Sequence, residues 1–444
     1  MSRPKRVLLL NPTYHRPLMR DTFHPTSKSA LYIWHPLDLL IQSGYLAGFD
    51  VRIHDGVVDN SRASLERTLA EFAPDAVLSL VAFPSLTSDL EILEGIKKRY
   101  GCTIFAVGDV TYGEREAFLA RHEFLDGILA DYTSRGFAQY LRGEPIRNAI
   151  WRDGDRICTE STHEPMDYAT PRHDLLDLSA YYLPYWKPPF GSVYSSHGCP
   201  AKCRFCVAPG WGRPRFRDTE AVLDEVGFLY HRGVRKVFFR DGSFNQSPPR
   251  MARLLEGIAA RYPGMRLTTW FKPKPLDAPM AKLMRAAGFE YVHIGVETGS
   301  PRFLRELGKD FALEEVEPGI DLLHRNGVKV VGHFMVGLPG ERDEDYRLTL
   351  RYLSRTRLDI VSFSAFEYSF GIKMRNEGGP ARPDHPDTVT RRRLYHLMAR
   401  FYARPDRWPR IWFFEDLAHV AASVPRIARY AADLRLYPRF GEIA

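Results

Sequence analysis

Short apolar runs alternate with amphipathic stretches through the first third of the chain. Runs rich in Val, Ile, Leu and Phe predict buried strands, at 6–11, 51–54, 76–83, 103–107 and 127–130. Between and after them, apolar residues recur at helical spacing, as at Leu86, Leu90, Leu93 and Ile96. The helices expected from this spacing are 36–47, 64–72, 88–99, 114–121 and 136–141. Five such units predict a flavodoxin-like or Rossmann-like domain with a parallel sheet covered on both faces.

The alternation stops at 151–189, which contains five prolines and many aromatic residues, and we interpret it as a connector. It returns from residue 190, with expected strands at 192–197, 236–241, 266–271, 291–297, 328–337 and 360–368. The expected helices are 220–231, 251–261, 280–287, 315–325 and 345–355. Six units of this kind predict a curved, partly open α/β barrel, whose chemistry lies at the C-terminal ends of its strands.

No strand is expected after residue 378. Phe413, Leu417, Val420 and Val424 begin a series at helical spacing that continues to Leu434 and is interrupted by Pro425. The chain is therefore expected to divide into four parts: an N-terminal domain over 1–150, a connector over 151–189, a barrel over 190–377 and a helical region over 378–444.

Charge and composition narrow the class of protein. The chain of 444 residues has 62 Lys and Arg against 54 Asp and Glu, and most of the excess lies in 391–444, with eleven Arg and five acidic residues. Such a basic region suits an anionic membrane surface, an anionic substrate or a solvated helix face. No recognisable nucleic-acid module accompanies it, so no nucleic-acid partner is expected.

Apolar runs in the chain are short. None approaches the roughly 20 residues of a membrane span. The run after the basic N-terminus, 7–10, is too short for a signal peptide. A cytoplasmic protein is expected, with peripheral membrane contact through Trp412, Phe413 and Phe414 as an open alternative to their packing in a core.

Three of the five cysteines are adjacent to the first barrel strand. Cys199, Cys203 and Cys206 have the spacing C-x3-C-x2-C, in a loop opened by Gly198. Three thiolates can hold three irons of a cubane cluster and leave the fourth iron without a protein ligand. The competing interpretation is structural zinc with His197 as a fourth ligand, although its position two residues before Cys199 makes a tetrahedral site awkward.

The cysteine loop, after the first strand of a six-stranded partial barrel, resembles the radical S-adenosylmethionine (SAM) superfamily. Four further segments resemble motifs of that family: 211–217, 241–244, 294–300 and 337–341. The resemblance implies that the open iron chelates the amino and carboxylate groups of SAM. One-electron reduction then yields methionine and a 5′-deoxyadenosyl radical. A flavodoxin-type or ferredoxin-type electron donor is expected.

The resemblance also assigns candidate residues. Cys199, Cys203 and Cys206 would bind the cluster. Phe205 would pack beside the adenine. Residues at the carboxyl ends of barrel strands would contact SAM, namely Asp241, Ser243 and Glu297.

A parallel domain ahead of such a barrel resembles the cobalamin-binding group. That group includes carbon and phosphorus methyltransferases, the anaerobic magnesium-protoporphyrin ester cyclase and hopanoid-modifying enzymes. The resemblance implies a corrin over the ends of strands three and four, near Pro84, Ser85 and Gly108. We expect a bulky side chain at Gly108 to fill the space of the corrin. Asp109 stands where relatives often have a second glycine, and we expect it to crowd the corrin unless it turns to solvent.

Two other segments depart from the group. After strand five the chain has Ala130-Asp131-Tyr132-Thr133 in place of a Gly-Glu segment, and after strand six 367–372 differs from the common Pro-Tyr-Pro-Gly-Thr. His54 lacks the surrounding Asp-x-His-x-x-Gly of mutases that ligate cobalt through histidine. These departures leave both the binding of cobalamin and the substrate open.

Three functions follow from these observations. The first is cobalamin-dependent radical methylation of an unactivated carbon in a small molecule or lipid. The second is radical cyclisation, rearrangement or hydroxylation of a tetrapyrrole, hopanoid or other lipid without methyl transfer. The third is a non-enzymatic iron–sulfur protein. Radical methylthiotransferases have a similar barrel but carry three cysteines in their N-terminal domain, where this chain has Cys102 alone.

Overall fold

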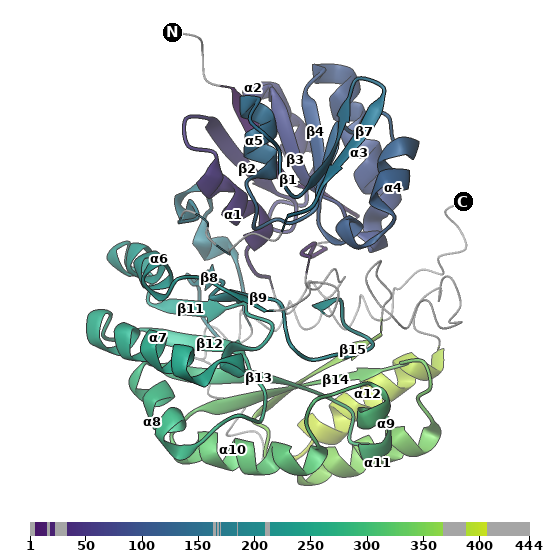
Figure 1. Cartoon of the computed structure of the whole chain (residues 1–444). Helices are drawn as coiled ribbons and strands as arrows, with labels where there is room; N and C mark the ends of the chain where they lie inside the picture. The colour runs from purple at the N-terminus through teal and green to yellow at the C-terminus, as the bar shows by residue number, and fades with distance from the viewer. Residues whose placement is uncertain are drawn as a thin grey trace. The chain divides into compact units, whose positions relative to one another are not determined.

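The structure is a computed structural model that describes residues 5–15, 18–22, 33–162, 166, 168, 170–183, 185–208, 214–366 and 388–405. The described residues up to Leu183 form one compact unit, and those from Tyr185 onward form a second (Figure 1). None of the helices in these ranges is both long enough and apolar enough to cross a membrane.

The first unit contains a sheet of seven strands in the order β2-β1-β3-β4-β5-β6-β7. The bounds are β1 Arg6–Asn11, β2 Asp50–Asp55, β3 Ala76–Leu80, β4 Thr103–Val107, β5 Gly127–Leu129, β6 Ala149–Asp153 and β7 Arg156–Glu160. Strands β1 to β5 are parallel, which confirms the predicted sheet. The antiparallel pair β6 and β7 was not predicted, and it extends the sheet into the expected connector. Gly154 and Asp155 form the tight turn between them, with Gly154 at φ 59°.

Helices cover this sheet because its strands are apolar on both faces. The bounds are α1 Leu37–Tyr45, α2 Arg62–Phe72, α3 Leu86–Tyr100, α4 Arg115–Arg121 and α5 Gly136–Arg142. Alternate residues of β1 face opposite sides of the sheet. Leu8 and Leu10 pack in one core with apolar residues of α2, α3 and α4. Val7 and Leu9 point to the other face and are also fully buried.

The second unit contains six parallel strands in the order β15-β14-β13-β12-β11-β8. The bounds are β8 Gly191–Val193, β11 Lys236–Phe239, β12 Arg266–Trp270, β13 Phe289–Glu297, β14 Lys329–Val336 and β15 Ile360–Ala365. Each strand lies beside the next in the chain, as the predicted partial barrel requires. The first predicted strand is divided, because β9 Ser196–His197 leaves the main sheet and pairs antiparallel with β10 Arg215–Phe216.

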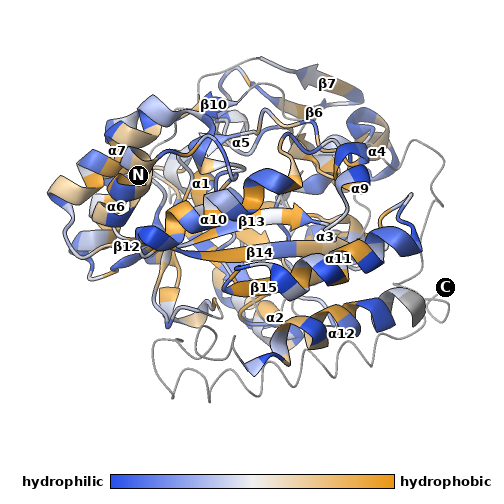
Figure 2. Cartoon of the chain, turned by 90° about the horizontal axis from the view of Figure 1, so that it is seen from below, coloured by the Kyte–Doolittle hydropathy of each residue, from blue (hydrophilic) through white to orange (hydrophobic). Residues whose placement is uncertain are grey.

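Helices follow the strands of this unit in alternation. The bounds are α6 Thr219–His231, α7 Pro248–Arg261, α8 Ala278–Ala286, α9 Pro301–Glu306, α10 Val316–Arg325, α11 Asp343–Arg355 and α12 Thr388–Tyr402. Figure 2 shows strands β13 and β14 as largely hydrophobic, beside helices α10 and α11 of mixed hydropathy. On α10 the buried residues Val316, Gly319, Ile320 and Leu323 recur at the spacing of one helical face.

Helix α12 belongs to the C-terminal region that was expected to be helical. Its Tyr402 accepts a hydrogen bond from the amide of Val361 on the edge strand β15 at 3.2 Å, so the helix protects that edge. The amphipathic series from Phe413 to Leu434 and the aromatic residues from Trp412 to Phe414 lie outside the described residues.

Gly108, at the end of β4, has a conformation that only glycine adopts readily. Its φ is 113°, and a Cβ atom there would lie 2.7 Å from the carbonyl oxygen of Val81. A side chain at Gly108 would therefore collide with the backbone after β3, and its effect on a corrin stays a prediction.

We predict that Gly108→Ala lowers the free energy of unfolding by about 3 kcal/mol. This value combines the cost of a positive φ at a residue with a side chain and the cost of a steric clash. Gly101→Ala is the matched control, because Gly101 also has a positive φ, of 61°, but nothing within 4 Å of its Cβ position. Gly101→Ala should lower the free energy of unfolding by about 1 kcal/mol. Urea unfolding measures both variants, and equal losses would contradict the steric account.

Candidate functional site

The cysteine loop leaves the barrel directly after β9. Gly198 turns the chain with φ 88°, and Cys203 is buried while Cys199 and Cys206 are partly exposed. The amide of Cys206 donates to the carbonyl of Cys203 at 3.2 Å, and the amide of Ala208 donates to Sγ of Cys206 at 3.4 Å. Amide hydrogen bonds to sulfur are among the contacts that adjust iron–sulfur clusters, so the donor set fits a cluster.

The described residues provide no conventional zinc site. In those ranges no group of three His, Cys, Asp or Glu side chains is placed to hold a single metal ion. His197, the possible fourth zinc ligand, has its Nδ1 atom 3.3 Å from Nη2 of Arg215. A cubane cluster needs a different arrangement, because each thiolate binds its own iron. The assignment of the three cysteines to a cluster stays a prediction.

Burial disfavours the thiolate forms of two cysteines of the loop. Burial raises the pKa of Cys203 and raises the pKa of Cys206 to about 12, while the charge of Lys309 acts in the opposite direction on both. Each thiol must lose its proton to bind iron. A positive charge beside the loop therefore favours the ligated form.

Glu297, the predicted SAM contact, ends strand β13 in a strained conformation. Its φ is 66°, and the pairing register between β13 and β14 shifts between Gly295 and Glu297. Such a bulge redirects a side chain at the end of a strand. A Cβ atom on Gly295 would lie 2.3 Å from Oε1 of Glu297, so glycine at 295 leaves room for the carboxylate.

The partner of Glu297 is Lys309, which the sequence did not predict. Nζ of Lys309 lies 3.2 Å from Oε1 of Glu297, and both side chains are largely buried. The same ammonium group lies 5.7 Å from the ring centre of Phe205 and 5.0 Å from that of Phe311. Lys309 follows the motif residue Glu297 by twelve positions, and no motif or spacing of the sequence links the two.

Phe205 is positioned by contacts between the cysteine loop and the segment after α9. The amide of Arg204 donates to the carbonyl of Leu307 at 2.9 Å, and Nη1 of Arg204 donates to the carbonyl of Glu306 at 3.2 Å. Gly308 permits this approach, because a Cβ atom there would lie 2.9 Å from the carbonyl oxygen of Lys202. The structure therefore brings Cys203, Phe205 and Glu297 to one site.

Asp241, at the end of β11, faces the chain that leads into the cysteine loop. It is fully buried, and its carboxylate accepts from the amides of Ser195 at 2.7 Å and Ser196 at 3.1 Å and from both hydroxyl groups. Arg250 donates to the Ser195 hydroxyl at 3.2 Å. Burial raises the pKa of Asp241, against the effect of these hydrogen bonds. Asp241 thus positions the start of the loop, and a contact with SAM stays a prediction.

Ser243 lies beside Asp241 but has a local role in the described contacts. Its hydroxyl donates to Oδ1 of Asn245 at 3.0 Å, and Nδ2 of Asn245 donates to the carbonyls of Lys272 and Pro275 at 3.1 and 3.0 Å. These bonds connect the ends of β11 and β12. A contact between Ser243 and SAM also stays a prediction.

Aromatic and imidazole rings from neighbouring barrel strands gather on one face of the sheet. The hydroxyl of Tyr185 lies 2.5 Å from Nε2 of His293, whose Nδ1 lies 2.8 Å from Nε2 of His333. The ring centre of Trp270 is 4.5 Å from that of His333. Burial, and then the charge of Arg240, lowers the pKa of His293 to about 3, so this imidazole is neutral at physiological pH.

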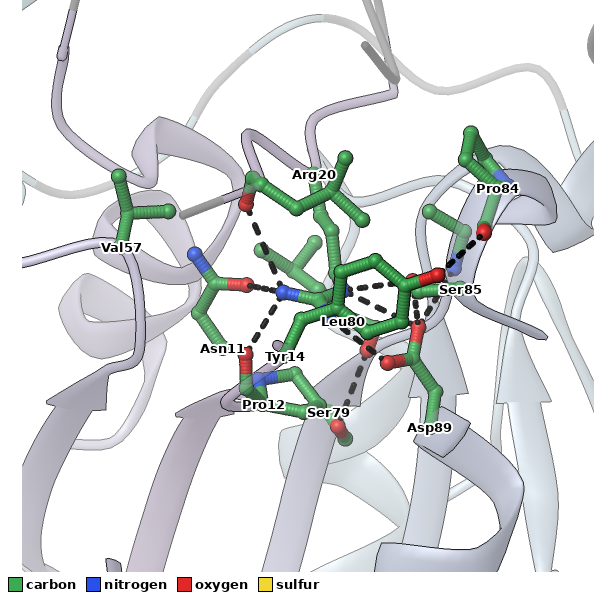
Figure 3. A network of polar contacts seen from close by, with 12 residues as sticks. Asn11, Pro12, Tyr14, Arg20, Val57, Ser79, Leu80, Pro84, Ser85 and Asp89 are labelled. Atoms are coloured by element: carbon green, nitrogen blue, oxygen red, sulfur yellow. Dashed lines mark hydrogen bonds and ion pairs between the residues drawn. The ribbon is translucent and has the colours of Figure 1, made fainter. Parts of the chain in front are cut away.

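In the first unit, the carboxyl ends of the strands are joined by a buried polar network. Arg20 is at its centre in Figure 3, where it contacts Asn11 at 3.1 Å, Ser85 at 3.0 Å and Asp89 at 2.9 Å. The Arg20 and Asp89 side chains are 1% and 0% exposed. Ser85 is itself buried, and the carbonyl of Pro84 accepts from Tyr14 at 3.4 Å. The predicted corrin residues Pro84 and Ser85 thus belong to a rigid edge.

Asp109 does not turn to solvent, contrary to one expected alternative. It is fully buried, and its two carboxylate oxygens accept from the amide of Phe83 at 3.0 and 3.2 Å. The side chain is therefore directed back to the end of β3. The crowding of a corrin by Asp109 stays a prediction.

Comparisons with known proteins agree with this architecture. Residues 193–353 match the sequence profile of the Radical SAM superfamily. An uncharacterised methyltransferase of Pyrococcus horikoshii, PH0819, is 25% identical over 347 residues, covering 71% of this chain and 72% of the relative. A tRNA-2-methylthio-N(6)-dimethylallyladenosine synthase of Anaeromyxobacter dehalogenans is 27% identical over 333 residues, covering 71% of this chain and 67% of the relative.

A solved structure shows the same fold across both units. It is that of the radical SAM methyltransferase TsrM from Kitasatospora setae, with cobalamin and a [4Fe-4S] cluster bound. The TM-score is 0.65 at 21% identity, and the match covers 87% of this chain and 81% of TsrM. The predicted fold class is therefore confirmed.

We predict that Asp241→Asn reduces the iron bound per chain although all three cysteines of the loop remain. The amide group would face two serine hydroxyls that now donate to the carboxylate, so the start of the loop would lose its buried anchor. Asp277→Asn is the control, because asparagine also caps a helix such as α8. Iron analysis after anaerobic reconstitution measures the effect, and an undiminished iron content would contradict the positioning role.

We predict that Asp109→Asn stabilises the first unit at about pH 8 and makes its stability less dependent on pH. Burial, with the nearby charge of Asp89, raises the pKa of Asp109 well above the value of roughly 3.9 expected in the unfolded chain. The folded state thus retains a proton that the unfolded state loses, and stability falls as pH rises through this window. Asparagine keeps an oxygen that accepts from the Phe83 amide, but it has no carboxyl group whose ionisation favours the unfolded chain at high pH.

Urea unfolding at about pH 5 and about pH 8 tests this expectation, with exposed Asp50→Asn as the control. Equal destabilisation of the Asp109 variant at both pH values would show instead that the fold requires the ionised carboxylate.

Proposed function

We propose that this chain, which carries a radical SAM domain over residues 193–353, is a cobalamin-dependent enzyme that methylates a carbon atom of a small molecule. The observation that carries the proposal is the loop of Cys199, Cys203 and Cys206 at the carboxyl ends of the barrel strands. It offers three thiols, whereas clusters that only transfer electrons commonly have four cysteines.

The residues around the loop fit the cofactors of such an enzyme. When bound there, a [4Fe-4S] cluster and SAM would supply a one-electron cleavage that produces a 5′-deoxyadenosyl radical. Phe205 would pack against the adenine ring, and the hydrogen bond from Arg204 to Leu307 fixes the loop that carries it. Glu297 presents a buried carboxylate that can accept hydrogen bonds from SAM.

The first unit supports the cobalamin part of the proposal. Its strands end in an edge at Pro84, Ser85 and Gly108, where the Asp109 carboxylate accepts hydrogen bonds from the amide of Phe83. TsrM, which shares the fold, is described with cobalamin bound. Ligands of parallel sheets bind at the carboxyl ends of the strands, where these residues lie.

A methylthiotransferase function, as in the relative from Anaeromyxobacter dehalogenans, is disfavoured by the remaining cysteines. The radical methylthiotransferases carry three cysteines in their N-terminal domain, whereas only Cys102 and Cys158 lie outside the loop here. Cys102 is buried, and burial raises its pKa to about 11, as expected for a structural thiol.

The ring cluster of the barrel supports a small organic substrate. Trp270 and His333 are partly exposed, whereas Tyr185 and His293, which belong to the same cluster of rings, are buried. An apolar or aromatic group can pack on such a surface and a polar group can reach an imidazole. Three further points stay predictions: a small molecule or lipid as substrate, a flavodoxin-type or ferredoxin-type electron donor, and contact with a membrane.

We predict that protein purified anaerobically and reconstituted contains about four irons per chain and binds cobalamin. Cys203→Ala should lose the cluster absorbance and all SAM cleavage, whereas Cys158→Ala, outside the loop, should retain both. The reaction product should be heavier than the substrate by one methylene group.

Two results would overturn parts of this proposal. A Cys203→Ala protein that keeps its iron and still cleaves SAM would contradict the assignment of the loop. A wild-type protein that binds no cobalamin yet converts its substrate would replace methylation with a radical reaction without methyl transfer.

A further inference from the structure

Lys309 places a positive charge between the cysteine loop and the end of β13. Its side chain is 11% exposed, its Nζ atom lies 3.2 Å from Glu297, and the ring of Phe205 is within the range of a cation–π contact. Gly308 and the Arg204–Leu307 hydrogen bond hold the backbone of this segment against the loop. The position of this charge is therefore set by the backbone and not only by a flexible side chain.

The charge of Lys309 lies close to residues that adjoin two of the cysteines. Its Nζ atom is 5.7 Å from the ring centre of Phe205, the residue before Cys206, and Gly308 lies against the carbonyl of Lys202, the residue before Cys203. The charges of Lys309 and Glu297 are largely buried, so water screens their effects on the loop less than at the surface. The positive charge of Lys309 and the negative charge of Glu297 therefore act in opposite directions on a charge bound at the cysteine loop.

Reduction of a cluster adds one negative charge, so its potential depends on nearby charges. A buried carboxylate without a counter-ion disfavours that added charge, and a buried ammonium group favours it. With both present, the net charge of the pair is zero, and the carboxylate can face SAM without making the cluster harder to reduce.

We propose that Lys309 is a positioning residue that compensates Glu297 and thereby sets the reduction potential of the cluster. This inference rests on the proposed function, since it requires a cluster on Cys199, Cys203 and Cys206. It assigns to Glu297 a second property besides contact with SAM, namely a charge that must be balanced.

The test is a double-mutant cycle on the reconstituted full chain without SAM. Lys309→Met keeps the length of the side chain and removes the charge, and Glu297→Gln removes the opposite charge. The probe is the midpoint potential of the cluster, followed by electron paramagnetic resonance during reductive titration. Lys282→Met, at an exposed position of α8, is the matched control.

Lys309→Met should reduce the ratio of reduced to oxidised cluster about tenfold at a given potential, which corresponds to a midpoint about 59 mV lower. Glu297→Gln should shift the midpoint upward, and the double variant should return close to the wild-type value. Lys309→Arg should retain the wild-type midpoint, because it restores the charge, and Lys282→Met should not change it.

Unchanged midpoints in both single variants would overturn the inference. So would shifts of the same sign in the two single variants, or a double variant whose midpoint stays as far from the wild-type value as that of a single variant. Iron content separates these results from a failure of the proposed function: a wild-type chain that binds no cluster refutes the function itself. If Lys309→Met does not fold, Glu297→Gln and Lys309→Arg still decide between the outcomes.

Discussion

The second unit depends on one buried carboxylate at the end of β11. Asp241 accepts hydrogen bonds from Ser195, which lies between β8 and β9, and from Ser196, the first residue of β9. The chain therefore leaves the main sheet at that point and enters the cysteine loop from a fixed position. The loop then meets the segment after α9 through Arg204 and Leu307. Through these two contacts the barrel controls where the thiols lie.

Buried ion pairs recur at the strand ends of both units. Arg20 pairs with Asp89 in the first unit, and Arg217 pairs with Glu225 in the second, with all four side chains almost fully buried. Removing one member of such a pair costs roughly 3–5 kcal/mol, because the other charge is left buried. Lys309 and Glu297 differ from these pairs in that they lie beside the thiols and the Phe205 ring. Their charges can therefore serve the cluster as well as the fold.

Much of the fold is predictable from hydrophobic spacing, because parallel strands between helices are apolar on both faces. The pattern locates β1 and β4 because their apolar runs, at 7–10 and 104–107, are uninterrupted. It misses the hairpin of β6 and β7, whose residues are half exposed and include Arg152 and Arg156. The cysteine loop is predictable from spacing alone. Lys309 is not, since its role depends on a bulge at Glu297 and on a backbone contact across about a hundred residues. The direction of the Asp109 side chain is likewise a tertiary property.

The central claim is that the three-cysteine loop leaves one iron open for SAM. Electron–nuclear double resonance of the reduced cluster, with SAM labelled by nitrogen-15 at its amino group, measures this directly. The account predicts that SAM changes the signal of the cluster and that the labelled nitrogen shows a coupling typical of a ligand bound to iron. A signal that SAM leaves unchanged, with no such coupling, would mean that the fourth iron is closed and would contradict the account.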